Sequence, residues 1–289
     1  MARLGIYEKA LPKGLTWKER LALVKELGFD FLEFSIDESD ERQARLEWTM
    51  AERQEIRDAI AETSTPIQTL MLSGHRKYSL GSSDPKIVER GLEMAYKAVQ
   101  LAVDLGIRHI QLAGYDVFYE EHTSETEQRF ITNLKKIVDY AASFDVMLDI
   151  ETMDTSFINS IEKVARYKKI IKSPWLAAYP DLGNLSAWPE NDVVKDFKDN
   201  LDIVAHVHLK DTLAVTDDFP GKFKNVEFGK GVVDFKALLQ LLKDLEYDGA
   251  FTIEMWSEDR DRPIEEINEA LDFFKPIFKE VGYQFGGLD

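Results

Sequence analysis

Apolar and polar positions along this chain fall into two alternating textures. The first is a short apolar run with β-branched or aromatic residues, and the second is a longer charged segment with helical spacing. Eight runs of the first kind predict β-strands: Leu4–Tyr7, Phe31–Ile36, Ile67–Leu72, His109–Ala113, Val146–Glu151, Leu176–Asp181, Ile203–Leu209 and Ala250–Trp256. Amphipathic segments follow them and predict helices at roughly 16–27, 49–62, 84–105, 124–143, 160–171, 190–200, 234–245 and 263–280. Strict alternation of this kind indicates a parallel sheet.

Eight strand–helix pairs in 289 residues fit one closed (β/α)8 TIM barrel. An open doubly wound sheet shows the same alternation, but the sequence contains no glycine-rich dinucleotide turn. No linker or shift in composition divides the chain, so we expect a single TIM-barrel domain over residues 1–289. The longest connection, Asp211–Gly231, follows the seventh strand, and loops of that length in compact domains tend to be functional.

Composition narrows the class of protein. The chain has 36 Lys and Arg against 53 Asp and Glu, a net charge of −17, which disfavours nucleic acid as a partner. The absence of cysteine excludes disulfides, thiolate metal sites and cysteine nucleophiles. Neither a secretory signal nor an apolar run of about 18 residues is present. We therefore expect a cytoplasmic protein without a membrane partner.

The predicted strand ends carry the strongest chemical signal, because TIM-barrel active sites lie at the carboxyl ends of the strands. Four consecutive strands, the fifth to the eighth, end at Glu151, Asp181, His208 and Glu254. Acids also end strands merely for solubility, but with only five histidines in the chain this series is not expected by chance. Two glutamates, an aspartate and an imidazole suit one divalent metal ion, Mn²⁺, Zn²⁺, Co²⁺ or Mg²⁺.

Alternation within the same strands places further polar side chains inside the barrel. Asp149, His206 and Thr252 each lie two residues before a proposed ligand and share its face. We expect them to hydrogen-bond the ligands from below and hold them in place. The alternative is that each is a polar core residue with a partner elsewhere. His206 is also the alternative histidine ligand, and His208 is favoured because it lies nearer the rim.

Several stretches resemble the xylose-isomerase-like TIM barrels, and within them the L-ribulose-5-phosphate 3-epimerases of ascorbate catabolism, also labelled hexulose-6-phosphate isomerases. They are residues 151–155 (ETMDT), 179–188 (YPDLGNLSAW), 206–212 (HVHLKDT), 225–234 (NVEFGKGVVD) and 253–258 (IEMWSE). The resemblance covers nearly the whole chain and implies the same four metal ligands. It also implies an isomerase of carbohydrate metabolism that inverts C3 of a ketopentose phosphate, interconverting L-ribulose 5-phosphate and L-xylulose 5-phosphate.

Inversion at C3 passes through an enediolate and needs two groups that exchange a proton on opposite faces of the carbon. Glu151 and Glu254 are the predicted acid/base pair, since the other two ligands come from the strands between theirs. Aldose–ketose isomerisation and 3-epimerisation of a free ketose are the alternatives on the same barrel. Free-ketose epimerases tend to carry histidine at the position of Asn184, so specificity for a free sugar does not carry over directly, and a phosphorylated substrate is compatible with the change. Metal-dependent cleavage of damaged DNA is disfavoured by the negative charge and the few histidines.

Two segments compete as the phosphate site. One follows the seventh strand and contains Lys210, Lys222 and Lys224 with the amides near Gly229 and Gly231. The other, His75-Arg76-Lys77, follows the third strand.

The remaining polar and aromatic candidates concern the sugar itself. Glu33 is predicted either to bind sugar hydroxyls or to solvate the rim. Trp256, Trp188 and Tyr7 are candidates for the wall of the sugar site. A small phosphorylated sugar is thus the expected partner, and a homodimer is possible for such a barrel.

Overall fold

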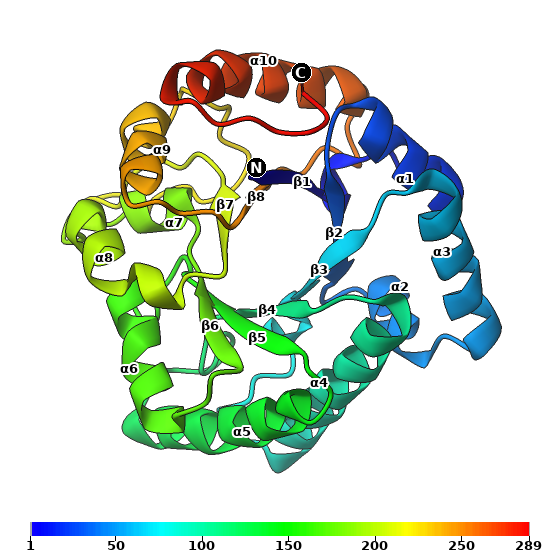
Figure 1. Cartoon of the computed structure of the whole chain (residues 1–289). Coiled ribbons are helices and arrows are strands. Elements are labelled where there is room, and N and C mark those ends of the chain that lie inside the picture. The colour runs from blue at the N-terminus through cyan, green and yellow to red at the C-terminus, as the bar shows by residue number, and fades with distance from the viewer. Residues whose placement is uncertain (1, 289) are drawn as a thin grey trace.

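The computed structural model describes residues 2–288, and these form a (β/α)8 barrel with the helices outside (Figure 1). The parallel strands are β1 (Arg3–Tyr7), β2 (Phe31–Ile36), β3 (Ile67–Leu72), β4 (His109–Ala113), β5 (Met147–Glu151), β6 (Leu176–Tyr179), β7 (His206–Leu209) and β8 (Ala250–Ile253). Their order in the eight-stranded sheet is β6-β5-β4-β3-β2-β1-β8-β7. The predicted fold class is confirmed.

The barrel closes between β6 and β7, where the pairing is sparse. Instead of a ladder, two isolated parallel bridges join Ala178 to Val204 and Asp181 to His208. The amide of His208 donates to the carbonyl of Pro180 at 2.9 Å. Every other neighbouring pair of strands forms a parallel ladder, and the ladder between β2 and β3 shifts register between Leu32 and Glu33. The seam therefore brings Asp181 next to His208 but has few backbone hydrogen bonds of its own.

The long helices agree with the predicted amphipathic segments. They are α1 (Trp17–Glu26), α3 (Met50–Thr63), α4 (Pro85–Leu105), α5 (Ser124–Ala142), α6 (Ile161–Ile171), α8 (Val193–Asn200), α9 (Phe235–Asp244) and α10 (Pro263–Val281). Short elements between them are α2 (Asp40–Gln43), α7 (Leu182–Ser186), η1 (Glu8–Ala10), η2 (Ala44–Glu47), η3 (Ser73–Arg76) and η4 (Leu201–Ile203). Among residues 2–288, no helix combines the length and the apolar character needed to cross a bilayer.

Local sequence explains where several helices begin and end. The side chains of Thr16 and Thr49 each accept a hydrogen bond from the backbone amide three residues later. The glutamate at that later position accepts one from the backbone amide of the threonine, which completes a capping box. Gly106 ends α4 with φ of +77°, a conformation that costs glycine little. Asp181 caps the amino terminus of helix α7, and its side chain accepts a hydrogen bond from the amide of Asn184. The sixth strand therefore stops at Tyr179, earlier than predicted.

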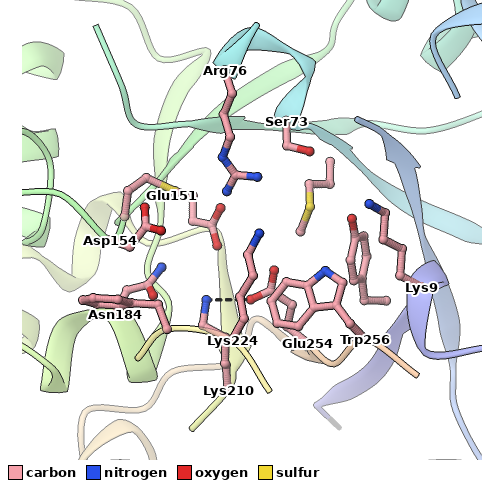
Figure 2. A pocket seen from close by; sticks show the side chains of 14 residues that line it. Lys9, Ser73, Arg76, Glu151, Asp154, Asn184, Lys210, Lys224, Glu254 and Trp256 are labelled. Atoms are coloured by element: carbon pink, nitrogen blue, oxygen red, sulfur yellow. Dashed lines mark ion pairs between the residues drawn. The ribbon is translucent and has the colours of Figure 1, made fainter. Parts of the chain in front are cut away.

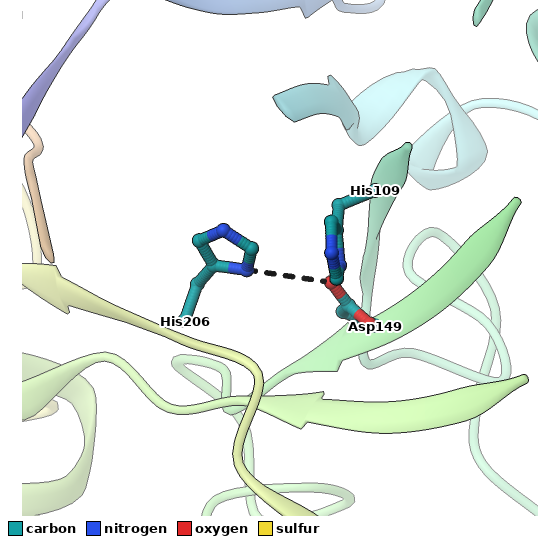
Figure 3. Close-up of side chains that lie close together, drawn as sticks. All are labelled: His109, Asp149 and His206. Carbon is teal, nitrogen blue, oxygen red and sulfur yellow. Dashed lines mark hydrogen bonds and ion pairs between the residues drawn. The ribbon is translucent and has the colours of Figure 1, made fainter. Parts of the chain in front are cut away.

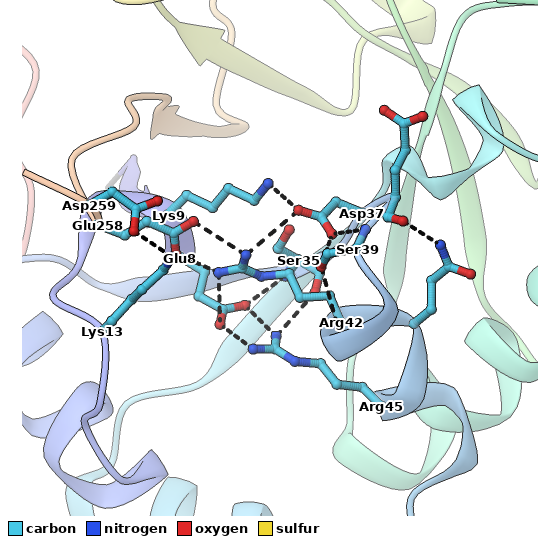
Figure 4. Close-up of polar contacts among 12 residues, drawn as sticks. Glu8, Lys9, Lys13, Ser35, Asp37, Ser39, Arg42, Arg45, Glu258 and Asp259 are labelled. Carbon is cyan, nitrogen blue, oxygen red and sulfur yellow. Dashed lines mark hydrogen bonds and ion pairs between the residues drawn. The ribbon is translucent and has the colours of Figure 1, made fainter.

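A buried ion cluster braces the carboxyl ends of β1, β2 and β8 (Figure 4). The Glu8 carboxylate is fully buried and accepts two hydrogen bonds from Arg45, both at 2.7 Å. Burial alone would raise the pKa of Glu8, but the charges of Arg45, Arg20 and Arg42 outweigh it and lower the pKa. Arg42 also donates to Glu258, after β8, at 2.6 Å. The cluster thus fixes the loops after β1 and β8 to β2.

Candidate metal and substrate site

Glu151, Asp181, His208 and Glu254 meet inside the carboxyl end of the barrel. One possible ligand atom from each lies within 4.8 Å of the others, and all four residues are buried. Nδ1 of His208 is 3.0 Å from Glu151 and 3.8 Å from both Asp181 and Glu254. Asp181 Oδ2 is buried and accepts no hydrogen bond from the described residues. Three buried carboxylates around one imidazole need a positive charge, so this donor set fits a divalent cation.

Glu33 orients the histidine of this cluster. Its Oε1 lies 2.7 Å from Nε2 of His208, and its Oε2 accepts from Thr69 at 2.7 Å and from Tyr179 at 2.8 Å. With Nε2–H donated to Glu33, the lone pair on Nδ1 faces the three carboxylates. Glu33 is fully buried, so it does not solvate the rim. Both of its oxygens have protein partners and it does not line the cavity, so the structure gives it no contact with a sugar hydroxyl there.

The two glutamates of the cluster differ in their electrostatic surroundings. Burial would raise the pKa of Glu254, but Lys210 and His208 outweigh it and lower the pKa to about 2. Lys210 Nζ lies 2.9 Å from Glu254 and 3.4 Å from Asp181. Burial and the nearby Glu254 raise the pKa of Glu151, and burial raises that of Asp181 to about 7. Glu254 is therefore held ionised, whereas protonation is easier at Glu151.

A small cavity opens above the cluster (Figure 2). Side chains from several strand ends and loops line it: Tyr7, Lys9, Met71, Ser73, Arg76, Glu151, Met153, Asp154, Asn184, Lys210, Phe223, Lys224, Glu254 and Trp256. Glu151 and Glu254 therefore face the same space. Tyr7 and Trp256 contact each other edge to face, with ring centroids 6.1 Å apart, and form part of the wall.

The cations of this cavity fall into two kinds. Lys9 is paired with Asp37 and Lys210 with Glu254. Arg76, from η3, and Lys224, from the loop after β7, form no ion pair with any residue of the described chain. Figure 2 shows their side chains extending toward one another from opposite sides. The two segments that compete in the sequence as phosphate sites thus each supply one cation to a single cavity.

Other parts of those two segments lie elsewhere. His75 is buried outside the cavity, with Nε2 3.0 Å from the carbonyl of Gly91, so the structure gives it no contact with a substrate there. The amides of Gly229 and Gly231 both donate to Asp211 at 2.9 Å and are already satisfied. Trp188 packs on Phe223 and does not line the cavity.

Asn184 takes part in the wall of the cavity through its amide. Its Nδ2 donates to the carbonyl of Thr152 at 2.7 Å, which fixes the side chain. Its Oδ1 is buried and has no hydrogen-bond partner in residues 2–288. An acceptor left free in this way is suited to a hydroxyl group of a bound molecule.

The polar residues expected beneath the ligands do not all hold them. Asp149 hydrogen-bonds His109 at 2.7 Å (Figure 3). His206 contacts the amide of Gln68 at 2.9 Å. Within the described part of the chain, neither residue hydrogen-bonds one of the four ligands. The expectation that Asp149 and His206 hold the ligands is therefore corrected. Burial lowers the pKa of His206.

Thr252 reaches the ligands only indirectly, and two unpredicted residues reach them directly. Thr252 bonds Tyr179 at 3.0 Å, and Tyr179 in turn bonds Glu33. Gln111 donates to the carboxylate of Glu151, and Thr152 Oγ1 accepts from the amide of Asp181 at 3.0 Å. Gln111 faces the barrel interior two residues before the end of β4, so its position on the inward face was the available signal.

The fold and the ligand set define a class of protein. Residues 21–277 match the model of the xylose isomerase-like TIM barrel family, and the chain belongs to that family. A putative L-ribulose-5-phosphate 3-epimerase, SgbU of Escherichia coli K12, is 49% identical over 97% of this chain and 98% of its own. L-Ribulose-5-phosphate 3-epimerase UlaE of Salmonella heidelberg is 47% identical over 96% of each chain.

Solved structures confirm the architecture at lower identity. A structure of L-ribulose 3-epimerase superposes with a TM-score of 0.76 at 18% identity, covering 98% of this chain and 96% of that one. The 3-keto-D-glucoside 4-epimerase YcjR of E. coli superposes with a TM-score of 0.75 at 17% identity, over 95% of this chain and all of the other. At these identities the comparison shows the fold alone.

Proposed function

We propose that this protein is a metal-dependent 3-epimerase that interconverts L-ribulose 5-phosphate and L-xylulose 5-phosphate, in line with the ascorbate catabolism suggested by its sequence. The observation that carries the proposal is the pair Glu151 and Glu254, buried in one four-ligand cluster and both facing one cavity. The identity of the substrate is taken from relatives that match over nearly their full length and are named L-ribulose-5-phosphate 3-epimerases.

Glu151, Asp181, His208 and Glu254 are the residues that would hold the divalent ion. Bound there, Mn²⁺, Zn²⁺, Co²⁺ or Mg²⁺ supplies a Lewis acid that stabilises negative charge on the oxygens of the substrate. Asp181 and His208 act mainly as ligands. Glu33 keeps His208 in the tautomer that ligation requires.

The glutamate pair moves the proton. Glu254, held ionised by Lys210, removes the proton from C3 of one epimer, and Glu151 returns a proton to the opposite face. The two groups exchange roles in the reverse direction. Environments that push the pKa values of two carboxyls apart are typical of such acid/base pairs.

The unpaired cations of the cavity bind the phosphate in this scheme. Arg76 offers a planar fork of donors and Lys224 a point charge. Neither forms an ion pair within the described chain, although the carboxylate of Asp154 in the same cavity offsets part of their charge. Asn184 Oδ1 accepts from a sugar hydroxyl, while Trp256 covers the carbon skeleton. Lys210 serves Glu254 and Asp181 instead of the phosphate, which changes the role expected for it from sequence.

The position of exchanged hydrogen distinguishes this reaction from aldose–ketose isomerisation. In D2O with Mn²⁺, the protein should convert L-ribulose 5-phosphate to L-xylulose 5-phosphate with deuterium at C3, observed by NMR. Glu151→Gln and Glu254→Gln should each abolish both exchange and conversion. Glu55→Gln, an exposed glutamate on α3, is the matched control and should retain both. Deuterium at C1 or C2 would instead support an isomerase, and near-normal turnover by Glu254→Gln would exclude the two-base scheme.

We further propose one domain over residues 1–289, a cytoplasmic location and no nucleic-acid partner. Pairing of β1 with β8 ties both ends of the chain into one sheet. A chain without cysteine suits a reducing compartment, and its charge of −17 repels phosphate backbones. The possible homodimer stays a prediction. Light scattering on the protein as it elutes from a size-exclusion column measures its mass and checks this prediction.

A further inference from the structure

A second cluster of metal-ligating side chains lies inside the barrel below the first. His109 on β4, Asp149 on β5 and His206 on β7 each present one ligand atom within 4.8 Å of the others (Figure 3). Asp149 and His206 are almost fully buried, and the side chain of His109 is 25% exposed. The cluster is reached by solvent past His109, away from the substrate cavity.

The hydrogen bonds of this cluster are incomplete. Asp149 Oδ1 and His206 Nδ1 are buried without a partner in residues 2–288. Nδ1 of His206 lies 3.8 Å from Asp149 Oδ2, too far for a hydrogen bond. Leaving a buried carboxylate oxygen and a ring nitrogen unsatisfied is costly, so both atoms call for a bound group.

The contact between His206 and Gln68 is compatible with a bound cation. It joins Nε2 of the ring to the amide nitrogen at 2.9 Å, while Gln68 Oε1 is buried without a partner. As placed, the amide nitrogen of Gln68 donates to Nε2 of His206, and the ring proton is on Nδ1. Exchanging the amide oxygen and nitrogen keeps one hydrogen bond between the two side chains but reverses it, with Nε2–H donating to Oε1. Nδ1 of His206 then carries a lone pair that faces the carboxylate of Asp149. This is the tautomer that a metal-ligating histidine adopts.

The distances are compatible with a small ion. In a tetrahedral zinc site with bonds of about 2.0–2.1 Å, neighbouring ligand atoms are about 3.3 Å apart. Nδ1 of His109 and Nδ1 of His206 lie 2.7 Å and 3.8 Å from Asp149 Oδ2, on either side of that value. The exposed side of His109 leaves room for water as a fourth ligand.

We propose that His109, Asp149 and His206 form a second metal site, of the Zn²⁺ type, which fastens β7 to β4 and β5 beneath the substrate site. Two imidazoles and one carboxylate favour Zn²⁺ over Mg²⁺ or Ca²⁺, whereas the three carboxylates above form a harder set. The site spans the seam where β6 and β7 share only isolated bridges. Its function is structural, because it closes the barrel where the backbone does so least.

Zinc titration of the chelator-treated protein by calorimetry tests the proposal. The unaltered protein should bind about two zinc ions per chain, and both Asp181→Asn, which weakens the upper site, and His109→Gln should bind about one. The double variant should bind none. His122→Gln, an imidazole half-exposed on the protein surface, is the control and should still bind two. Equal zinc binding by Asp181→Asn and the double variant would overturn the proposal.

X-ray absorption of the zinc retained by Asp181→Asn identifies its ligands even where His109→Gln fails to fold. Two imidazoles are expected in the lower site, whereas the upper site has only His208. Zinc should also raise the melting temperature of Asp181→Asn by several degrees. A single imidazole on the zinc, or no retained zinc, would reject the lower site. Failure of the epimerase assay alone would leave this result unaffected, because zinc binding is measured without substrate.

Discussion

The carboxylate of Glu33 lies 2.7 Å from Nε2 of His208, while Nδ1 of the same ring faces Glu151, Asp181 and Glu254. The imidazole is thus held at one nitrogen and free to ligate through the other. Metal sites depend on such outer carboxylates nearly as much as on the ligands themselves.

Replacing Glu33 should therefore weaken metal binding without removing a ligand. Glu33→Gln keeps the shape but loses the charge that fixes the tautomer of His208, and we expect Mn²⁺ affinity to fall about 10- to 100-fold. Calorimetric titration with Mn²⁺ measures the change, and activity should recover at high metal concentration. An unchanged dissociation constant would show that Glu33 does not orient the ligand. Glu55→Gln serves again as the control.

Lys224 should separate phosphorylated from unphosphorylated substrates. Removing a charge-assisted contact costs about 1.5–3 kcal/mol, so Lys224→Met should raise KM for the sugar phosphate by about 10- to 100-fold. KM for the free ketose should hardly change. Arg76→Met should act in the same way, whereas Lys222→Met, which lies outside the cavity lining, should not. Equal effects on both sugars would exclude a phosphate contact.

His75 should make stability depend on pH. Burial lowers the pKa of its imidazole to about 4 from the usual 6.5. The unfolded chain therefore binds this proton more readily, and the contribution of His75 is complete above pH 6.5 and lost as the pH falls toward 4. The expected loss is about 3 kcal/mol in the free energy of unfolding.

Urea denaturation at several pH values in that range measures the slope. His75→Gln can still donate to Gly91 but does not titrate, so it should show a shallower slope than the unaltered protein. Parallel curves for His75→Gln and the unaltered protein would contradict the assignment.

Arg45 should be important for stability rather than for chemistry. Arg45→Met leaves the carboxylate of Glu8 buried with fewer partners, and breaking a buried ion pair from one side costs about 3–5 kcal/mol. The double variant with Glu8→Gln should recover part of the loss. Arg108→Met, at an exposed arginine just before β4, should lie within about 0.5 kcal/mol of the unaltered protein. Chemical denaturation gives all three values, and a loss below about 1 kcal/mol for Arg45→Met would argue against this role.

Much of the fold and the four-ligand cluster follow from the sequence because both rest on local patterns. Alternation locates the strands, and parallel strands in a barrel must bring their carboxyl ends to one rim. Glu151 ends β5, and Asp181 caps helix α7 just after the neighbouring strand β6. Knowing where each apolar run ends is therefore sufficient to predict that the two side chains meet at this rim.

Partners inside the barrel are harder to predict because they depend on the stagger between strands. Asp149 stands directly beside Gln111 on β4, yet it bonds His109, two residues earlier. Glu33 is the third residue of β2 and still reaches His208 across the interior. The shear of the barrel sets these levels, and no spacing within a single strand encodes it.

Asp211 has a consequence for how such an enzyme can change. Its side chain receives the amides of Thr212, Gly229 and Gly231, so the long excursion after β7 is anchored at its base, three residues beyond His208. The outer part of this loop, which carries Lys224, extends from the base that Asp211 fixes. Insertions and substitutions in this outer part can change which substrates bind, while the metal ligands beneath it keep their positions. Selectivity and catalytic geometry can therefore evolve separately in this chain.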